Sequence, residues 1–472
     1  MRALQSTWWL VCAAALSGCS ADNGTQDGHG SGDGGDRDAV GMDVRSPNDV
    51  VSVTDGATPT DSRMGYCMGE GPPVMVGDAD GGVPAGTCAA SIAARVFSNA
   101  VCSCTDASIA GYFQTRSFDS GMGGVLIAEG GPVGLNNTYN SGSYTDVGGT
   151  FSIDGINPVH FLGYLKVGGD MFINAGFDFI GYTQIHRDLW MNGNTSSLGL
   201  VTVGRDVHVT PGHAAPLVAN ISGHTYTAAF TVPPPCDCAP GDLLDIAGIV
   251  AEAATGNDNA SVGLDPATLS AVVGIGVDLT LPCGRFYVNS VGGLGGITLN
   301  VPGRTALFVG GDVNAIGAFN VHLGPMGELD LFIGGNLLSI GAGSFGSQSR
   351  PAATRIYVAG TSDVVLVGAS GFVGNVYAPR ARITAVGATT VYGSLFGRLI
   401  DMPGYLDVHY DRAILGVGHD CPHIPGPCTQ CSGTCSGMQA CVSGACAPCT
   451  SDSDCCAPLV CYSNGTCQPL LG

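Results

Sequence analysis

Cysteine and histidine residues gather near the C-terminus at spacings that metal sites use. Two Cys-x2-Cys pairs, the first formed by Cys428 and Cys431, follow His419 and His423, and such a set can hold zinc. In an exported chain the same thiols form disulfides instead, and a small segment with little core needs them in order to fold. Because eleven cysteines crowd into residues 421–472, we favour disulfides and predict no metal site.

Cys19 stands in a different context, directly after a short apolar stretch. Arg2 and the apolar residues 8–16 form the pattern of an export signal. The sequence Leu16-Ser17-Gly18-Cys19 resembles the lipobox of bacterial lipoproteins, which implies that Cys19 is diacylated and becomes the first residue of the mature protein. Two or more acyl chains anchor a protein stably, and Ser20 in place of Asp implies the outer membrane by that family's sorting rule. The alternative is a soluble secreted protein in which Cys19 is incidental.

The number of cysteines limits how they pair. The chain has 20, and removal of Cys12 with the export signal and of Cys19 by lipidation leaves 18 disulfide candidates, seven in the body and eleven in the tail. Both numbers are odd, so at least one bridge joins tail to body if every thiol is paired, and Cys421 and Cys283 are the candidate partners. The body candidates are Cys67, Cys88, Cys102, Cys104, Cys236, Cys238 and Cys283, and the tail candidates are Cys421, Cys428, Cys431, Cys435, Cys441, Cys446, Cys449, Cys455, Cys456, Cys461 and Cys467.

Acidic side chains recur along the chain at a fixed spacing. Asp170, Asp188 and Asp206 lie 18 residues apart, and Asp312 and Asn336 hold the same place in later copies of the surrounding phrase. Carboxylates stacked about 4.8 Å apart repel one another unless they are neutralised, so a calcium ladder is one interpretation. The nine-residue Gly-Gly-x-Gly-x-Asp period of calcium-binding repeats is absent from the sequence. We therefore favour carboxylates that accept backbone N–H groups at turns, and we predict no cofactor.

An aromatic column is the candidate ligand face. If the odd positions of each copy point inward, then Phe172, Trp190 and His208 point outward, one above another. Flat rings on an outer face are common in sugar-binding surfaces. The alternative, which we favour, is that a helix predicted at about 243–254 covers the column. In that case Trp190→Ala would destabilise the fold rather than weaken the binding of a ligand.

No catalytic residue stands out. Right-handed β-helices host polysaccharide lyases and hydrolases, which need paired carboxylates, or calcium with a basic residue, in a groove. The available candidates are scattered and belong to no recognisable catalytic motif. We therefore predict that the protein is not an enzyme and keep a carbohydrate-active enzyme as the alternative. The scattered candidates are Asp330, Arg355, Arg380, Arg382 and Asp411.

The elements that must position these residues are short repeated strands. A seven-residue phrase with alternating apolar residues begins at Val167, Ile185 and Val203, and it returns with longer spacing at Val309 and Ile333. A fixed period near twenty is typical of a coiling β-solenoid, in which neighbouring rungs complete each other's core. The predicted fold class is all-β: a β-solenoid, of the right-handed parallel β-helix type, with one α-helical insertion and a disulfide-rich C-terminal tail.

Composition agrees with this fold and excludes some partners. The 75 glycines follow no Gly-X-Y period, so collagen is excluded. Lysine and arginine together number 17 against 38 acidic residues, a net charge of −21, which argues against nucleic-acid binding.

The chain divides into seven predicted segments. The Gly/Asp/Ser-rich stretch after Cys19 cannot bury enough apolar surface to fold, and Asp242 is the expected N-cap of the inserted helix. A second, shorter helix is expected at about 89–99. The segments are a lipoprotein signal peptide with the lipidated cysteine (1–19), a disordered acidic tether (20–62), a Cys-containing N-terminal cap region (63–114), a first β-solenoid block (115–232), a Pro/Cys linker with the helical insertion (233–277), a second β-solenoid block (278–420) and a disulfide-rich tail (421–472).

Two stretches resemble known families. Residues 373–379 (Val-Gly-Asn-Val-Tyr-Ala-Pro), 391–395 (Val-Tyr-Gly-Ser-Leu) and 408–411 (Val-His-Tyr-Asp) resemble the end of an uncharacterised Gly-rich β-helical domain of PilX-like and myxobacterial surface proteins. The resemblance covers about 278–415, implies architecture and a surface setting, and carries over no catalytic residue. The cysteine run that begins at Cys449 resembles the small disulfide-rich tails of myxobacterial secreted proteins.

These observations together predict a surface or envelope lipoprotein, extracytoplasmic and lipid-anchored at the outer membrane or cell surface. Its expected role is structural or adhesive, with an elongated β-helical face presented to glycan, matrix or envelope proteins. Exposed solenoid ends favour self-association unless they are capped, and the N-terminal cysteine region and the tail are the candidate caps.

Overall fold

The computed structural model describes most of the chain between residues 87 and 417. The described residues are 66–67, 75–76, 87–216, 219–274, 276–340, 344–367, 371–417, 440–442, 445–447, 459–461 and 467–469. The chain separates into two units, Met1–Asp49 and Val50–Gly472, and every described residue belongs to the second. The predicted export signal, Cys19 and the acidic tether lie outside the described residues, as do Cys421, Cys428, Cys431, Cys435, Cys449, Cys455 and Cys456.

Two small hairpins form the described part of the tail. β34 (Ala440–Val442) pairs antiparallel with β35 (Ala445–Ala447), and β36 (Leu459–Cys461) pairs with β37 (Cys467–Pro469). Each hairpin places two cysteines at paired backbone positions, Cys441 with Cys446 and Cys461 with Cys467.

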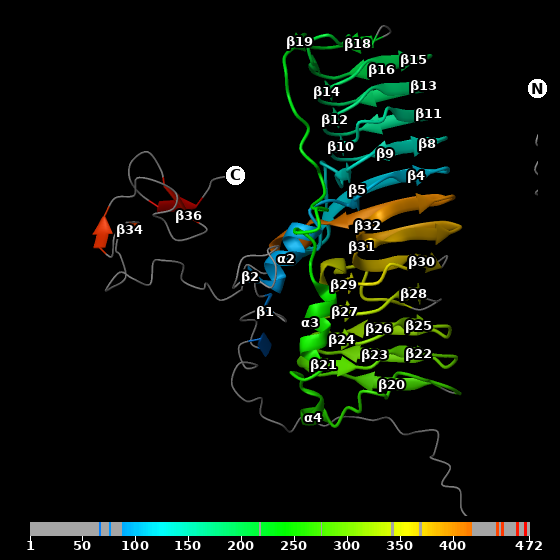
Figure 1. Ribbon diagram of the computed structural model, residues 1–472, viewed down its shortest axis with the longest axis vertical. Coiled ribbons are helices and arrows are strands. Elements are labelled where there is room, and N and C mark those ends of the chain that lie inside the picture. Colours follow the sequence, from blue (N-terminus) through cyan, green and yellow to red (C-terminus); the bar gives the residue numbers. More distant parts are fainter. Residues whose placement is uncertain are drawn as a thin grey trace, which may run out of the picture. The chain divides into compact units, whose positions relative to one another are not determined.

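The core of the fold is a parallel β-solenoid, as the repeats predict (Figure 1). The repeated phrases stack in register, so that Met171 lies beside Leu189, which lies beside Val207. These inward residues are fully buried, because alternation along each strand turns one set of side chains into the coil. The first block contains β7 (Val133–Leu135), β8 (Tyr139–Ser141), β9 (Tyr144–Val147), β10 (Phe151–Ile153), β11 (Val159–Val167), β12 (Met171–Ile173), β13 (Phe177–Ile185), β14 (Leu189–Met191), β15 (Thr195–Ser197), β16 (Leu200–Val203), β17 (Val207–Val209), β18 (Ala219–Ile221) and β19 (Thr225–Thr227).

The second block has longer rungs, also as predicted. Val309 lies beside Ile333, which lies beside Val358, so successive rungs are offset by 24 and 25 residues. The strands are β20 (Val277–Thr280), β21 (Gly284–Val288), β22 (Val291–Gly293), β23 (Ile297–Val301), β24 (Arg304–Val309), β25 (Val313–Ala315), β26 (Phe319–Leu323), β27 (Glu328–Ile333), β28 (Leu337–Ile340), β29 (Thr354–Val358), β30 (Val364–Val367), β31 (Phe372–Val386), β32 (Ala388–Met402) and β33 (Tyr405–Asp411).

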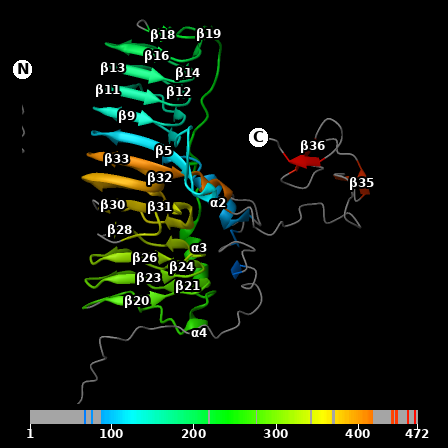
Figure 2. The ribbon, with the colours of Figure 1, turned by 180° about the vertical axis from the view of Figure 1, so that it is seen from behind.

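The two blocks join in an order that differs from the order of the chain. β3 (Val101–Ser103) pairs with both β32 and β7, and β4 (Ala107–Ile109) pairs with β32 and β8. β5 (Phe113–Asp119) likewise pairs with β33 and β9. The first turn of the first block therefore stacks on the last turn of the second, and Figures 1 and 2 show blue β5 beside orange β32 or β33.

This order corrects the expectation for the N-terminal cap. Residues 101–114 form part of a turn in the middle of the stack instead of covering its end. The two ends of the solenoid are formed by β18 and β19 on one side and by β20 on the other (Figure 1). The sequence did not reveal this because the repeat spacing records only neighbours within a block.

The segment between the blocks runs back along the stack. Disulfides Cys102–Cys236 and Cys104–Cys238 fasten it to the junction turn. It continues into α3 (Ile246–Ala253), which packs against β21, β24 and β27 of the second block, and then into α4 (Asn259–Val262). Figures 1 and 2 show this green segment following one side of the solenoid.

The inserted helix starts later than predicted. Asp242 is held in a preceding turn, where its N–H donates to the carbonyl of Ala239 over 2.8 Å. Asp245 is the N-cap instead, and its carboxylate accepts the N–H of Gly248 at 3.0 Å.

The coiled part of the described chain begins and ends at the middle of the stack, where β3 pairs with β32 and β5 with β33. α2 (Ala89–Val96), which matches the predicted short helix, packs beside η3 (Arg412–Gly416), which follows β33. Before α2, β1 (Met75–Val76) pairs antiparallel with β2 (Thr87–Cys88). A third disulfide joins Cys67 to Cys283. The predicted bridge between Cys283 and Cys421 is therefore wrong.

Candidate binding site at the junction of the two blocks

The aspartate column acts through the backbone. One carboxylate oxygen of Asp170 accepts the N–H of Asp188 at 3.0 Å, and Asp188 does the same for Asp206 at 2.9 Å. In the second block Asp312 accepts the N–H of Asn336 at 2.7 Å. Each side chain thus fixes the turn of the next rung, which confirms the backbone-bonding interpretation. Among the described residues, no group of three or more His, Cys, Asp or Glu side chains is placed to hold a metal ion.

The predicted aromatic column forms, but a different segment covers it. Phe172, Trp190 and His208 stack with centroids 5.9 and 3.6 Å apart, and the stack continues to Tyr226. Phe230, on the returning segment, packs its edge on Trp190 at 5.2 Å. The covering helix was expected here, yet α3 lies on the second block. The column is partly covered and its ring faces are occupied by one another, so it offers few faces to a ligand.

The helix instead covers a second aromatic ladder. Phe308, Phe332, Tyr357 and Tyr377 follow one another on β24, β27, β29 and β31, with centroids 4.6 to 6.3 Å apart, and all are buried. Tyr377 accepts the N–H of Leu244, just before α3, over 3.3 Å. Burial raises the pKa of Tyr377 to about 12, so its hydroxyl stays protonated. This ladder is an inner layer of the protein.

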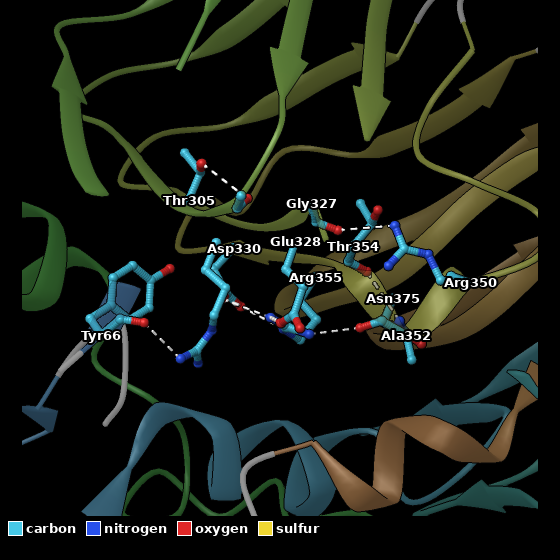
Figure 3. Close-up of polar contacts among 12 residues, drawn as sticks. Tyr66, Thr305, Gly327, Glu328, Asp330, Arg350, Ala352, Thr354, Arg355 and Asn375 are labelled. Atoms are coloured by element: carbon cyan, nitrogen blue, oxygen red, sulfur yellow. Dashed lines mark hydrogen bonds and ion pairs between the residues drawn. The ribbon is translucent and has the colours of Figure 1, made fainter. Parts of the chain in front are cut away.

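Two of the scattered enzyme candidates form a buried ion pair in the same layer (Figure 3). The Arg355 guanidinium donates to both carboxylate oxygens of Asp330, at 2.6 and 2.9 Å, and to Glu328 at 3.0 Å. Burial alone would lower the pKa of Arg355, but the carboxylate of Asp330 and then that of Glu328 raise it well above its usual value. The remaining donation goes to the carbonyl of Ala352 at 2.7 Å. With its charges paired in this way, the cluster fastens β27 to β29.

Asp411 has a structural role. Its carboxylate is fully buried and accepts from the backbone N–H and hydroxyl of Ser120 at 2.9 and 2.7 Å, and from the N–H of Ala352 at 3.1 Å. Ser120 begins η1 (Ser120–Met122), and Ala352 lies in η2 (Pro351–Ala353). The last two candidates lie apart, because Arg380 is exposed and Arg382 pairs with Asp363 and, at 3.3 Å, with Asp401.

A third aromatic ladder crosses the junction and is partly exposed. Tyr405, Tyr112, Tyr144, Tyr164 and Tyr182 stack in that spatial order, with centroids 4.8 to 5.5 Å apart. The first belongs to the second block, and the other four belong to the first block and its junction turn. The ladder therefore forms only because the two blocks stack end to end.

Glycine sets the position of the ladder. Gly181 adopts φ +135° where β13 bends, and a Cβ there would lie 2.0 Å from the carbonyl oxygen of Gly163. Only glycine fits such a close approach. The dipeptide Gly-Tyr occurs at 65–66, 111–112, 163–164, 181–182 and 404–405, and the last four supply tyrosines of the ladder. This repeated dipeptide is a signal in the sequence that could have revealed the ladder, and our reading of the seven-residue phrase missed it.

A row of polar side chains runs beside the tyrosines. Asp407, Gln114, Asp146, Lys166 and Gln184 occupy paired positions on successive strands. Lys166 donates to Asp146 at 3.1 Å. At either side of this pair, Gln114 accepts from the hydroxyl of Tyr112 at 2.6 Å, and Gln184 accepts from that of Tyr164 at 3.1 Å. The row is a continuous strip of hydrogen-bonding groups.

Two grooves flank a hairpin that projects from this face. β5 continues through η1 into the antiparallel β6 (Val125–Ile127), and Leu126 is 77% exposed. A groove of about 230 Å³ lies on one side of Leu126, and one of about 500 Å³ lies on the other. We call the two together the junction groove. Its polar lining includes Gln114, Arg116, Asp146, Lys166, Arg350 and His409.

The electrostatics of the junction groove favour fixed charges. His409 bonds Asp407 at 3.1 Å and stacks on Tyr392 at 4.7 Å. Burial would raise the pKa of Asp407, but the bond from His409 and the nearby charges of His409 and Arg116 bring it below its usual value. A general acid needs a raised pKa. Asp407 is therefore suited to remain ionised and not to donate a proton.

Comparison with known proteins adds one match. A family model described as a domain of unknown function (DUF7305) matches residues 237–417. The match spans α3, α4 and the whole second block, including His409 on one side of the junction groove, while Lys166 and Gln114 lie outside it. No curated protein and no solved structure matches the chain. Within the described residues, we find no helix with the length and apolarity required to cross a membrane.

Proposed function

We propose that this protein is an outer-membrane or cell-surface lipoprotein, anchored through Cys19, with a structural or adhesive role. Its binding face is the junction groove with the tyrosine ladder beside it, and its partners are glycan, matrix or envelope proteins. The observation that carries this proposal is the polar strip, which runs in register across five strands beside a groove on an elongated solenoid.

Several features support an adhesive role. The residues at the strip present fixed hydrogen-bonding groups, and the rigid rungs beneath them hold these groups at a regular spacing. The resemblance of the second block to PilX-like and myxobacterial surface proteins fits the same setting.

A glycan array combined with a reducing-sugar assay tests this function. The full chain is used with Cys19→Ser, so that acyl chains do not cause association. We expect glycan binding without release of reducing sugar. Release of reducing sugar from a bound polysaccharide would contradict the adhesive role and support the carbohydrate-active enzyme instead.

The anchor is tested separately in cells. The unsubstituted protein should fractionate with the outer membrane, and Cys19→Ser should move it to the soluble fraction because the acyl chains supply the attachment. An unchanged distribution would contradict lipid anchoring.

A further inference from the structure

The junction groove differs in charge from the chain that surrounds it. The sequence carries 38 acidic residues against 17 basic ones. Among the residues that line the groove the balance is reversed, with three basic side chains, Arg116, Lys166 and Arg350, and one carboxylate, Asp146. Lys166 is also the only lysine in the sequence. A local excess of positive charge on an otherwise acidic protein creates a positive electrostatic potential in the groove, which attracts an anionic ligand.

We infer that the junction groove binds an acidic oligosaccharide, and that Arg116 and Lys166 hold its carboxylate or sulfate groups. This inference rests on the proposed glycan-binding function and names the ligand class for that site.

Arg116 and Lys166 each have N–H donors available for a ligand. Arg116 is exposed and donates one N–H to Gln114 at 2.7 Å. Lys166 is 33% exposed at its side chain and donates to Asp146 at 3.1 Å. A guanidinium has five N–H donors and an ammonium three, so each has more than these bonds use. Asp146, itself largely buried, holds the ammonium in place at the floor of the groove.

The two cations stand on different strands of the groove. Arg116 lies two residues along the strand from Gln114, and Lys166 lies two strands away from Gln114 through Asp146. At about 3.3 Å per residue and 4.8 Å per strand, the two backbone positions are roughly 12 Å apart. Their side chains reach toward the neighbouring residues Gln114 and Asp146, so an oligosaccharide with acidic groups on successive units can contact both cations.

The remaining lining suits a sugar. Leu126 and Ile127 of β6 form an apolar wall, while the amide of Gln114 adds a polar group to the lining. A saccharide has apolar C–H faces and polar hydroxyls, so it can use both kinds of surface. The wall therefore favours an acidic sugar over inorganic phosphate.

Binding of defined oligosaccharides tests this inference. The probes are oligogalacturonate and heparin fragments, which carry carboxylates and sulfates, with neutral cello-oligosaccharides for comparison. In calorimetry at low salt we expect binding of one or both acidic probes, a loss of about tenfold in affinity with Arg116→Gln, and weakening as salt rises. Arg382→Gln, in a surface ion pair outside the groove, is the matched control and should bind as the unsubstituted protein does.

The single lysine provides a second readout that does not depend on a variant folding. An amine-reactive reagent modifies one side chain in the protein, and peptide mass mapping separates it from the N-terminal amine. A bound acidic probe should slow modification of Lys166 at least severalfold, and Lys166→Arg should retain binding.

Two results separate failure of this inference from failure of the proposed function. Binding of neutral glycans, with no preference for acidic probes and unchanged modification of Lys166, would overturn the inference alone. Absence of any glycan binding would overturn both.

Discussion

Two aromatic ladders in this solenoid have similar stacking and different positions. Phe308, Phe332, Tyr357 and Tyr377 are buried beneath α3 and the residues before it, whereas the ladder from Tyr405 to Tyr182 is partly exposed. Ring spacing is about 5 Å in both because the rungs set it. The difference lies in what covers them. A stacked column is therefore core or surface according to the path of the returning chain, and stacking by itself does not identify a ligand face.

The largest contrast between the two ladders should appear in stability. Phe332→Ala removes a fully covered ring and should lower the free energy of unfolding by about 3–5 kcal/mol. Tyr164→Ala removes a ring with its edge in water and should lower it by about 1 kcal/mol. Denaturant unfolding of the two variants measures the difference, and equal losses would contradict the distinction between covered and uncovered ladders.

The ion pair beside the buried ladder gives the next prediction. Arg355→Ala leaves Asp330 buried without its partner and should cost about 3–5 kcal/mol of unfolding free energy. Arg382→Ala breaks a solvent-screened pair at the surface and should cost far less unfolding free energy than Arg355→Ala. Denaturant unfolding again measures both. A small effect of Arg355→Ala would mean that the cluster is open to water.

Trp190 tests the column that the sequence suggested as a ligand face. Trp190→Ala loses its stacks with Phe172 and His208 and its contact with Phe230, so we expect a loss of about 1–2 kcal/mol. Glycan binding at the junction groove should be unchanged. A variant with normal stability and lost binding would place the ligand on this column instead.

Low pH should lower the free energy of unfolding because Glu328, at the edge of the buried layer, becomes protonated. Burial would raise the pKa of Glu328, but the charge of Arg355 and the bond to it bring the pKa below its usual value. The stability that this carboxylate adds is present above the pKa of the unfolded chain and is lost as the pH falls through the lower folded pKa. Glu328→Gln should therefore flatten the dependence of unfolding free energy on pH in that acidic range. An unchanged pH profile would show that Glu328 does not contribute.

The pairing of the cysteines gives a prediction that is tested by disulfide mapping and not by a stability measurement. Six of the seven body cysteines are joined to one another. If all thiols are paired, the odd number in the tail requires Cys88 to be the body partner of a tail cysteine. Non-reducing peptide mapping should recover Cys88 bridged to a tail peptide. Recovery of Cys88 as a thiol would contradict complete pairing.

The sequence was sufficient for features that depend on neighbours in the chain. The 18-residue spacing of the repeated phrase predicts the parallel rungs, the buried odd positions and the column of Phe172, Trp190 and His208. The turn role of Asp170 and Asp188 follows from the same spacing, because each residue bonds its equivalent one rung away.

What the sequence could not show depends on contacts between distant segments. The pairing of β5 with β33 joins residues almost 300 positions apart, and the ladder through Tyr405 and Tyr112 exists only because of it. The path of residues 228–254 decides which aromatic column is covered, and no local pattern encodes that path. Lys166 was overlooked because one lysine has no periodicity, and its significance comes from the groove around it.

Hydrogen–deuterium exchange with and without an acidic oligosaccharide tests the central claim, that the junction groove is the binding face, most directly. We predict slower exchange of backbone amides in residues 113–130 and 405–411 when the ligand is bound, and unchanged exchange in β12, β14 and β17. Protection confined to those three strands, or to the end of the solenoid at β18 and β19, would contradict the account.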